Sequence, residues 1–404
     1  MPALDLTDPA ALRQADDRAD DRVDDRVDDR AAAKPRLSTR LLFLIVGLAN
    51  ATWAPLVPLV KDRAGLDAAG LGLLLLTFGI GSILAMPSAG AAAARLGFRP
   101  VLLAGTLAIG LALPVLAVGT GLVPLTGALL LFGAGMGAVD CVMNLQAVAV
   151  ERAAGRPMMS GFHGLYSLGC ILGALLASGL LAAGLGAGWS VLLLVAGIAA
   201  LFAAAWPGIL RTDRAVGGGG PAFALPRGPV LVLGLLCFVV FLTEGSALDW
   251  SAVFLIQQRG LDPAWAALGY AAFSVTMTAG RLAGDGVVAR LGRRRVVVLG
   301  GLLAAAGLGL SVLVPAWEAA LAGYALVGAG CANIVPVLFT AAGRQTAMPA
   351  SVAVPAVTTL GYAGVLAGPA LIGFAAQAFG LSAAFLLVAA LLLGVAAAGR
   401  SLRV

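Results

Sequence analysis

The stretch VLLAGTLAIGLALPVLAVGTGLVPLTGALLL, residues 101–131, contains no charged side chain. A helix needs about 20 mostly apolar residues to span a bilayer, so this stretch holds one span, a turn, and the start of a second span. Lipid cannot satisfy exposed backbone polar groups, which favours helices. The short alternating segments typical of a β-barrel are not seen here. This stretch predicts an all-α membrane protein.

The composition of the whole chain agrees with this interpretation. Hydrophobic residues make up 60% and charged residues 11%, whereas soluble domains carry about 25% charged residues. The mean hydropathy is +0.99, so the bilayer is the expected solvent. The basic pI does not indicate nucleic-acid binding, because the basic residues are spread among short loops. The four cysteines lie in apolar runs without disulfide or metal-ligand spacing: Cys141, Cys170, Cys237 and Cys331.

Apolar runs continue along the chain and predict about twelve transmembrane helices. The expected spans are 41–60, 70–92, 101–118, 124–150, 161–184, 189–209, 229–256, 264–284, 296–314, 317–342, 352–379 and 383–398. They form two six-helix bundles, 41–210 and 229–404, joined by a polar linker, 211–228. We expect the protein to be a monomer in the lipid bilayer.

The first forty residues form a polar tail, 1–40. Its stretch from Asp16 to Arg30 repeats the unit Asp-Asp-Arg-x. As a helix this repeat would stack like charges four residues apart, which is destabilising. We therefore expect a disordered tail, and it is no signal peptide because no apolar stretch precedes Leu41.

Loop charges predict the orientation. Lys and Arg gather on one side of the predicted topology, in the tail and at Arg95, Arg99, Arg152, Arg156, Arg211, Arg214, Arg227, Arg290, Arg293, Arg294, Arg295, Arg344, Arg400 and Arg403. The other side holds Lys61, Arg63 and Arg259. The positive-inside rule then puts both termini in the cytoplasm of a multi-pass protein of the cell (inner) membrane.

The chain is duplicated. Ala94-Arg95-Leu96-Gly97 recurs as Ala289-Arg290-Leu291-Gly292, an offset of 195 residues (289 − 94), and the same offset relates Gly133-Ala134-Gly135 to Gly328-Ala329-Gly330. Shifted by one residue, Tyr166 aligns with Tyr362. Two six-helix halves with the same orientation are parallel repeats about an axis along the membrane normal.

The loop Gly90-Ala-Ala-Ala-Ala94-Arg95-Leu96-Gly97-Phe98-Arg99 resembles the Gly-x-x-x-Asp-Arg-x-Gly-Arg-Arg motif of the major facilitator superfamily. The resemblance covers about 41–398 and implies the major facilitator fold and alternating-access transport. Ala94 departs from the motif at its acidic position, and so does Ala289 in the second half. A family mechanism that relies on that carboxylate is therefore not expected in its usual form.

Two further stretches resemble the bacterial YbjJ-like branch, near the fucose-permease-like transporters. They are 140–163, which begins Asp140-Cys-Val-Met-Asn144-Leu-Gln146, and Thr243-Glu244-Gly245-Ser246-Ala247-Leu248-Asp249-Trp250-Ser251-Ala252. This resemblance implies a transporter and names no solute. It also implies that the first, fourth, seventh and tenth spans line a central cavity.

Ionisable residues inside the bilayer are costly, by at least about 2.5–3.5 kcal/mol, and mark functional sites. Those predicted for the substrate cavity or proton coupling, with polar and aromatic partners, are Asn50, Trp53, Asp140, Asn144, His163, Tyr166, Glu244, Asp249, Trp250 and Asn333. Polar bonding between helices and plain packing are the alternatives for each. Those predicted for a cytoplasmic gate are Arg95, Gly97, Arg99, Arg281, Asp285, Arg290 and Gly292. Arg281 and Asp285 have the i,i+4 spacing of an ion pair.

The sequence contains no ATP-binding loop, metal-binding cluster or nucleophile elbow, so we expect no enzyme activity and no cofactor or metal. The predicted function is secondary active transport of a small organic solute, coupled to protons through a buried carboxylate. Sugar uptake and drug or metabolite efflux both stay open. A lipid-handling membrane enzyme and a non-transporting sensor are the alternatives, and the tail is the only candidate output element of a sensor.

Overall fold

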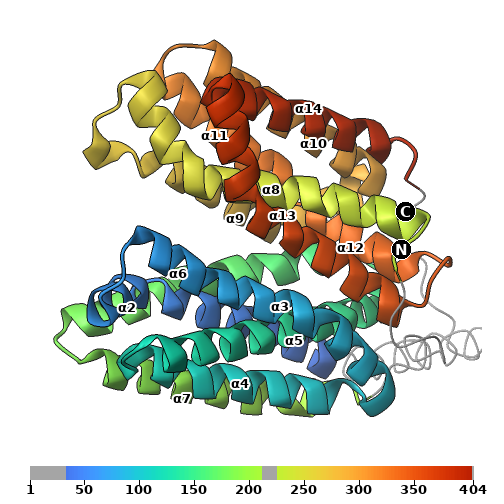
Figure 1. Ribbon diagram of the computed structural model, residues 1–404. Coiled ribbons are helices and arrows are strands. Elements are labelled where there is room, and N and C mark those ends of the chain that lie inside the picture. Colours follow the sequence, from blue (N-terminus) through green and yellow to red (C-terminus); the bar gives the residue numbers. More distant parts are fainter. Residues whose placement is uncertain (1–32, 212–224, 403–404) are drawn as a thin grey trace, which may run out of the picture.

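The computed structural model describes residues 33–211 and 225–402, which form two helical bundles side by side (Figure 1). The first bundle contains helix 33–53, α2 (Leu56–Ala64), α3 (Ala68–Leu96), α4 (Phe98–Val118), α5 (Leu122–Ala154), α6 (Met159–Ala182) and α7 (Ala187–Ala205). The second contains α8 (Pro229–Arg259), α9 (Leu268–Leu291), α10 (Arg293–Leu313), α11 (Trp317–Cys331), α12 (Ile334–Arg344), α13 (Ala350–Phe379) and α14 (Leu381–Gly399). The predicted all-α membrane fold is confirmed.

Eleven helical stretches of the described residues are long and apolar enough to cross a membrane. The twelfth span is α9, which has 24 residues but carries Arg281 and Asp285 in its apolar run. A single stretch, Ala33–Ala64, makes the first span. It breaks at residues 54–55, where Pro55 cannot donate a backbone hydrogen bond and α2 begins.

The first span begins earlier than the sequence predicts. The sequence predicts a disordered tail that includes residues 33–40, but these residues are helical and continue into the span. Ser38 and Thr39 are buried, and the Ser38 hydroxyl donates a 2.6 Å hydrogen bond to the carbonyl of Ala205. Ser38 thus anchors the helix start to the end of α7, and Thr39 accepts a 3.0 Å hydrogen bond from Gln146 of α5. The remainder of the predicted tail, 1–32, and linker residues 212–224 lie outside the described residues.

The tenth span is broken into α11 and α12 at residues 332–333. Pro336 has no backbone N–H, so the carbonyl of Ala332 lacks its helical donor, and the proline ring crowds that carbonyl. Asn333 occupies the break and donates a 3.0 Å side-chain hydrogen bond to Gly280 of α9. The break therefore joins two spans of the second bundle.

Glycine contacts at repeat-related positions show why the halves fold alike. Gly133 of α5 packs on the backbone carbonyl of Phe78 in α3, and Gly328 of α11 packs on that of Phe273 in α9. A Cβ at either glycine would collide with the neighbouring backbone. Small residues let membrane helices approach this closely. The sequence duplication thus corresponds to a duplicated helix contact.

The bundles have two ends. We call the end that carries Gly97, Gly155, Gly292 and Gln345 the terminal face, since the described chain also begins and ends there (Figure 1). Gly97 and Gly292 adopt positive φ of 85° and 78° and end α3 and α9 at equivalent positions. A residue with a side chain would be strained in that conformation. The other end is the opposite face.

Two arginines of the opposite face close helix ends in a repeat-related manner. Arg63 donates to the carbonyls of Leu116, Ala117 and Gly119, all within 2.8 Å, at the end of α4. Arg259 donates to Ser311 and Val312 at the end of α10. Both guanidinium groups satisfy carbonyls that have no helical donor and offset the negative end of the helix dipole.

The outer surface of the bundles suits lipid. Exposed leucines line it, including Leu84 at 70% and Leu175 at 64%. Exposed tryptophans lie at the opposite-face ends of three spans, at Trp189, Trp265 and Trp317. Tryptophan is enriched where membrane meets water, so these residues mark one edge of the apolar band.

Candidate functional site: a polar cavity between the two bundles

A cavity of about 330 Å³ lies between the bundles and is lined by both of them. Its size is at the small end of ligand-binding pockets. The first bundle contributes residues of the first span, α3, α5 and α6, and the second contributes residues of α8, α9, α12 and α13. Six of the residues predicted for the cavity line it: Asn50, Asp140, Asn144, His163, Tyr166 and Glu244.

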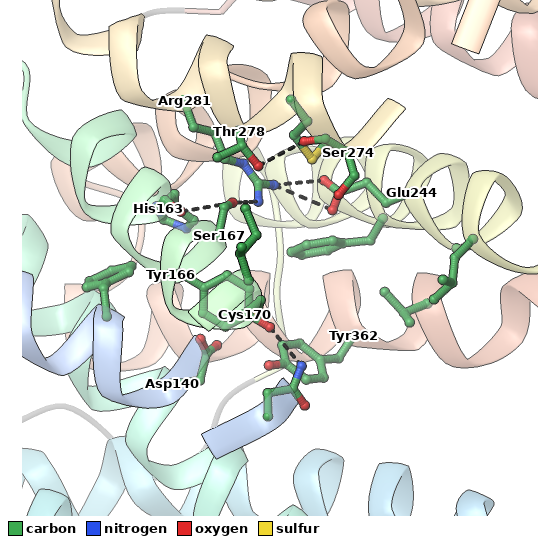
Figure 2. A pocket seen from close by; sticks show the side chains of 18 of the residues that line it. Asp140, His163, Tyr166, Ser167, Cys170, Glu244, Ser274, Thr278, Arg281 and Tyr362 are labelled. Atoms are coloured by element: carbon green, nitrogen blue, oxygen red, sulfur yellow. Dashed lines mark hydrogen bonds and ion pairs between the residues drawn. The ribbon is translucent and has the colours of Figure 1, made fainter. Parts of the chain in front are cut away.

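Arg281 of α9 is the cation of the cavity (Figure 2). Its Nη2 lies 3.2 Å from Oε1 of Glu244 on α8, and its Nη1 donates a 3.1 Å hydrogen bond to Ser167 on α6. The side chains of Arg281 and Glu244 are 6% and 19% exposed. One guanidinium therefore pairs with a carboxylate in its own half and holds the other half through a hydroxyl.

Asp140 of α5 differs from Glu244, because its carboxylate has no partner among the described residues. It is 8% exposed and lines the cavity. Asn144, one helical turn away, is 1% exposed and donates a 2.8 Å hydrogen bond to the backbone carbonyl of Asp140. Its Oδ1 is buried and accepts no hydrogen bond from the described residues. This end of the cavity therefore holds hydrogen-bond acceptors that lack donors.

Aromatic and polar side chains stand beside Asp140 (Figure 2). The amide of Asn50 donates a 3.1 Å hydrogen bond to the hydroxyl of Tyr166. Tyr362, the repeat equivalent of Tyr166, lies edge-on to Phe241 with ring centroids 6.2 Å apart. The two tyrosines bring matching aromatic walls from the two halves to one ligand volume.

His163 lies against the cavity wall near the terminal face. Its Nδ1 is 3.0 Å from the carbonyl of Met159, and its ring packs between Phe43 and Phe339 at centroid distances of 5.0 and 5.7 Å. The ring is 9% exposed. This packing fixes the ring and gives it a structural role in addition to its place in the lining.

Four residues predicted for the cavity lie elsewhere. Trp53 is packed in the core, and Asn333 sits at the break between α11 and α12. Asp249 is exposed, five residues beyond Glu244 on the continuous helix α8. Trp250 packs near Gly373 of α13, outside the cavity lining.

Between the cavity and the terminal face, α5 closes against the second bundle. Glu151 accepts 2.8 Å hydrogen bonds from Thr340 of α12 and from the backbone of Met159, and it lies 3.6 Å from Arg293. Arg152 donates to the carbonyl of Gly343. Asp285 accepts a 3.1 Å hydrogen bond from the backbone of Gly161. We call the contacts of Glu151, Arg152 and Asp285 the terminal-face latch.

The residues predicted for the gate lie in several different places. Arg95 and Arg290 are exposed and make no hydrogen bond or ion pair within the described residues, and Gly97 and Gly292 form the helix turns. Arg99 donates to Ile209 and stacks over Trp206, within its own bundle. Asp285 belongs to the latch, and Arg281 lies in the cavity. The i,i+4 ion pair expected between those two does not form, since Arg281 faces Glu244.

Sequence reasoning missed several contributors to the site. Ser167, Ser274, Thr278 and Tyr362 line the cavity, and Glu151 carries the latch. The match of Tyr362 to Tyr166 in the repeat was a usable signal. A Glu at the end of an apolar helix gives no such signal, because loop charges commonly lie there. No group of three metal-binding side chains occurs within residues 33–211 and 225–402.

The family comparison agrees with this architecture. The sequence model of the Major Facilitator Superfamily matches residues 41–290. An uncharacterized MFS-type transporter of Yersinia pestis is 51% identical over 370 residues, covering 91% of this chain and 95% of the relative. Membrane protein MosC of Rhizobium meliloti is 35% identical, covering 86% of this chain and 85% of MosC. The chain belongs to the major facilitator superfamily and is a multi-pass membrane transporter.

Solved structures share the fold at low sequence identity. FucP, a major facilitator transporter in its outward conformation, superposes with a TM-score of 0.75 at 18% identity, covering 93% of this chain and 99% of FucP. The human organic anion transporter MFSD10 superposes with a TM-score of 0.73 at 20% identity, covering 91% of this chain and 99% of MFSD10. These likenesses confirm the predicted major facilitator fold.

Proposed function

We propose that this transporter moves a small organic solute across the cytoplasmic membrane by alternating access, coupled to protons, with the terminal face in the cytoplasm. The observation that carries the proposal is the cavity between the halves, which holds two carboxylates. Asp140 is unpaired, and Glu244 is paired with Arg281. Ionisable side chains at membrane depth are costly and mark transport pathways and proton relays.

The position of Arg281 gives a route from protonation to movement. Adding a proton to Glu244 removes the counter-charge of Arg281 and frees the guanidinium to change its partners. Because Arg281 also donates to Ser167 of the first bundle, such a change acts on a contact between the halves. Asp140 is the parallel proton acceptor in the first bundle, and one elementary charge moved across the membrane yields about 2.3 kcal/mol per 100 mV.

The distribution of contacts supports an outward-facing state. Among the described residues, the hydrogen bonds and ion pairs that join the halves are Arg281–Ser167 and four latch contacts: Glu151–Thr340, Glu151–Arg293, Arg152–Gly343 and Asp285–Gly161. They hold the bundles together from the cavity to the terminal face, and none joins them nearer the opposite face. With the terminal face in the cytoplasm, a solute would enter from outside, and the latch would open to release it.

The test is a solute screen in proteoliposomes that contain a trapped pH indicator. Sugars, polyols, amines and organic acids are added outside at equal pH, and solute-dependent proton flux is recorded. At least one solute is expected to move protons, and an imposed pH gradient is expected to drive its accumulation. Empty liposomes and the Asp140→Asn, Glu244→Gln double variant are the controls. A solute that equilibrates without proton flux and ignores the gradient would contradict proton coupling.

A further inference from the structure

Two hydrogen-bond acceptors at the Asp140 end of the cavity receive no hydrogen bond from the described residues. The Asn144 amide nitrogen donates to the backbone carbonyl of Asp140, and a carbonyl can only accept, so this bond fixes which way the amide points. Its Oδ1 is thereby left as a buried acceptor without a donor. The Asp140 carboxylate, on the same helix face, also has no donor among the described residues. Unsatisfied buried acceptors are costly, so a ligand that donates hydrogen bonds is favoured here.

The charge of the lining is unbalanced in the same place. Glu244 and Arg281 neutralise each other at 3.2 Å, and Ser167 occupies a second nitrogen of the guanidinium. Asp140 then remains as one negative charge without a counter-ion. A buried carboxylate requires a cation or a proton, and the Arg281 cation is already engaged. A neutral polyol would satisfy the acceptors and leave the charge uncompensated, whereas an anion would add to it.

The walls beside Asp140 suit a cation. Tyr166 and Tyr362 stand next to it, with Phe241 against Tyr362 (Figure 2). Aromatic faces attract ammonium groups, by about 2 kcal/mol or more where water is excluded. The cavity volume of about 330 Å³ limits the ligand to a small molecule. A primary ammonium offers three donors in a compact group, which matches two carboxylate oxygens and the Asn144 oxygen.

We infer that the transported solute is a small primary amine in its ammonium form, bound by the Asp140 carboxylate and the Asn144 oxygen between the two tyrosines. The inference rests on the proposed function, in that the cavity is taken as the solute site. Asp140 then accepts either a proton or the solute's ammonium group. The Glu244–Arg281 pair faces the uncharged part of the solute.

The test is equilibrium binding to the full-length protein in detergent, measured by calorimetry and by thermal shift. The probes are triplets matched in shape that differ in charge: D-glucosamine, D-glucose and D-glucuronate; cyclohexylamine, cyclohexanol and cyclohexanecarboxylate; 2-phenylethylamine, 2-phenylethanol and 3-phenylpropionate. In at least one triplet the ammonium member is expected to bind ten times more tightly than its partners. Asp140→Asn removes this preference, Asn144→Leu weakens it severalfold, and Asp249→Asn, the control outside the cavity, leaves it unchanged.

Three outcomes overturn the inference: no ammonium member binds, an alcohol or carboxylate binds as tightly as its amine, or the preference survives in Asp140→Asn. If Asp140→Asn does not elute as a single folded species, Asn144→Leu carries the test, because it keeps the charge. Equilibrium binding needs no gradient. Ammonium selectivity in the binding assay without proton flux in proteoliposomes would therefore contradict proton coupling and leave this inference standing. Proton-coupled flux of a neutral or anionic solute, without ammonium selectivity, would contradict this inference and leave the proposed function standing.

Discussion

Arg281 on α9 lies 3.2 Å from Glu244 on α8, and the same guanidinium donates to Ser167 on α6. An ion pair within one half is thereby joined to the other half by a hydroxyl. Removing one partner of a buried ion pair leaves an uncompensated charge, which is costly, whereas replacing both partners is often tolerated. The pair therefore links charge state to contact between the bundles.

Glu244→Gln tests the coupling role of this pair. The glutamine keeps the shape but cannot release a proton, so net proton movement should stop while the cavity persists. For a solute that the parent protein accumulates with protons, we expect gradient-driven accumulation to fall to background and counterflow at equal pH to remain. Asp140→Asn should also lose gradient-driven accumulation, and its counterflow should fall as well because Asp140 is inferred to bind the solute. Asp249→Asn, exposed and outside the cavity, should behave as the parent. Parental accumulation in both cavity variants would exclude these carboxylates as carriers.

A double-mutant cycle measures the thermodynamic link. Arg281→Met strands the Glu244 carboxylate and is expected to destabilise the protein by about 3 kcal/mol, the lower end for a broken buried pair, because Glu244 keeps access to the cavity. Adding Glu244→Gln to it should restore most of the loss. The measurement is the midpoint of thermal unfolding in detergent for the parent, both single variants and the double variant. Additive losses would indicate that the two side chains do not interact.

Glu151 is expected to govern the terminal-face latch. It is 2% exposed, accepts a hydrogen bond from Thr340 of α12 and lies 3.6 Å from Arg293 of α10, both in the second bundle. A hydrogen bond to a charged group contributes about 1.5–3 kcal/mol. Glu151→Gln should raise the population open at this face about tenfold. Spin labels at Arg156→Cys and Arg344→Cys, in a background without the native cysteines, report the separation.

Two matched variants accompany that measurement. Glu318→Gln changes an exposed carboxylate of the opposite face and should leave the distance distribution unchanged. Arg95→Ala, which removes an exposed arginine of the predicted gate, should shift it less than Glu151→Gln. A larger shift from Arg95→Ala would place control of opening on the loop instead of the latch.

Gly343→Ala tests the same closure by crowding. A Cβ at Gly343 of α12 would collide with the Val148 side chain of α5. Overpacking of this kind costs about 1–3 kcal/mol, and here it penalises only the closed state. The spin labels at positions 156 and 344 should therefore show a larger population at the longer distance, which corresponds to the state open at the terminal face. Gly179→Ala on α6, where a Cβ meets nothing, controls for the gain in helix propensity. Equal spectra for both variants would speak against a close contact between α5 and α12.

Orientation is testable with single cysteines in intact cells. Arg227→Cys and Ser401→Cys lie on the terminal face, and Glu318→Cys lies on the opposite face. The excess of basic residues on the terminal face predicts that it is cytoplasmic. A membrane-impermeant maleimide should label position 318 directly and the other two only after permeabilisation. Strong labelling at 227 or 401 in intact cells would invert the topology.

The sequence predicts the fold well because lipid imposes few solutions. Apolar runs locate the spans, and the repeat offset already pairs Gly133 with Gly328, which make the same helix contact. The sequence predicts too short a first span, since the polar Ser38 and Thr39 are typical of a tail. The Ser38 hydroxyl bonds Ala205 of α7 and the Thr39 hydroxyl accepts from Gln146 of α5, and only the folded structure supplies these neighbours.

The site is harder to predict because sequence spacing does not identify partners. Glu244 and Asp140 stand out as charges within apolar runs, and both line the cavity. The four-residue spacing predicts that Arg281 pairs with Asp285, but its partner is Glu244, 37 residues earlier and on another helix. Which face of a helix meets a cavity depends on the packing of both bundles. Ser167 and Tyr362 belong to the site for that reason alone.

The arginines that close α4 and α10 have an electrostatic consequence for the entrance. Arg63 and Arg259 account for most of the basic charge on the opposite face, yet both are bonded to helix-end carbonyls, where the dipole supplies about half a negative charge each. Asp62 and Glu318 on that face are exposed. Charged surfaces raise the local concentration of oppositely charged solutes. In the proposed outward-facing state, this face would therefore concentrate cationic solutes at the mouth of the cavity, ahead of Asp140.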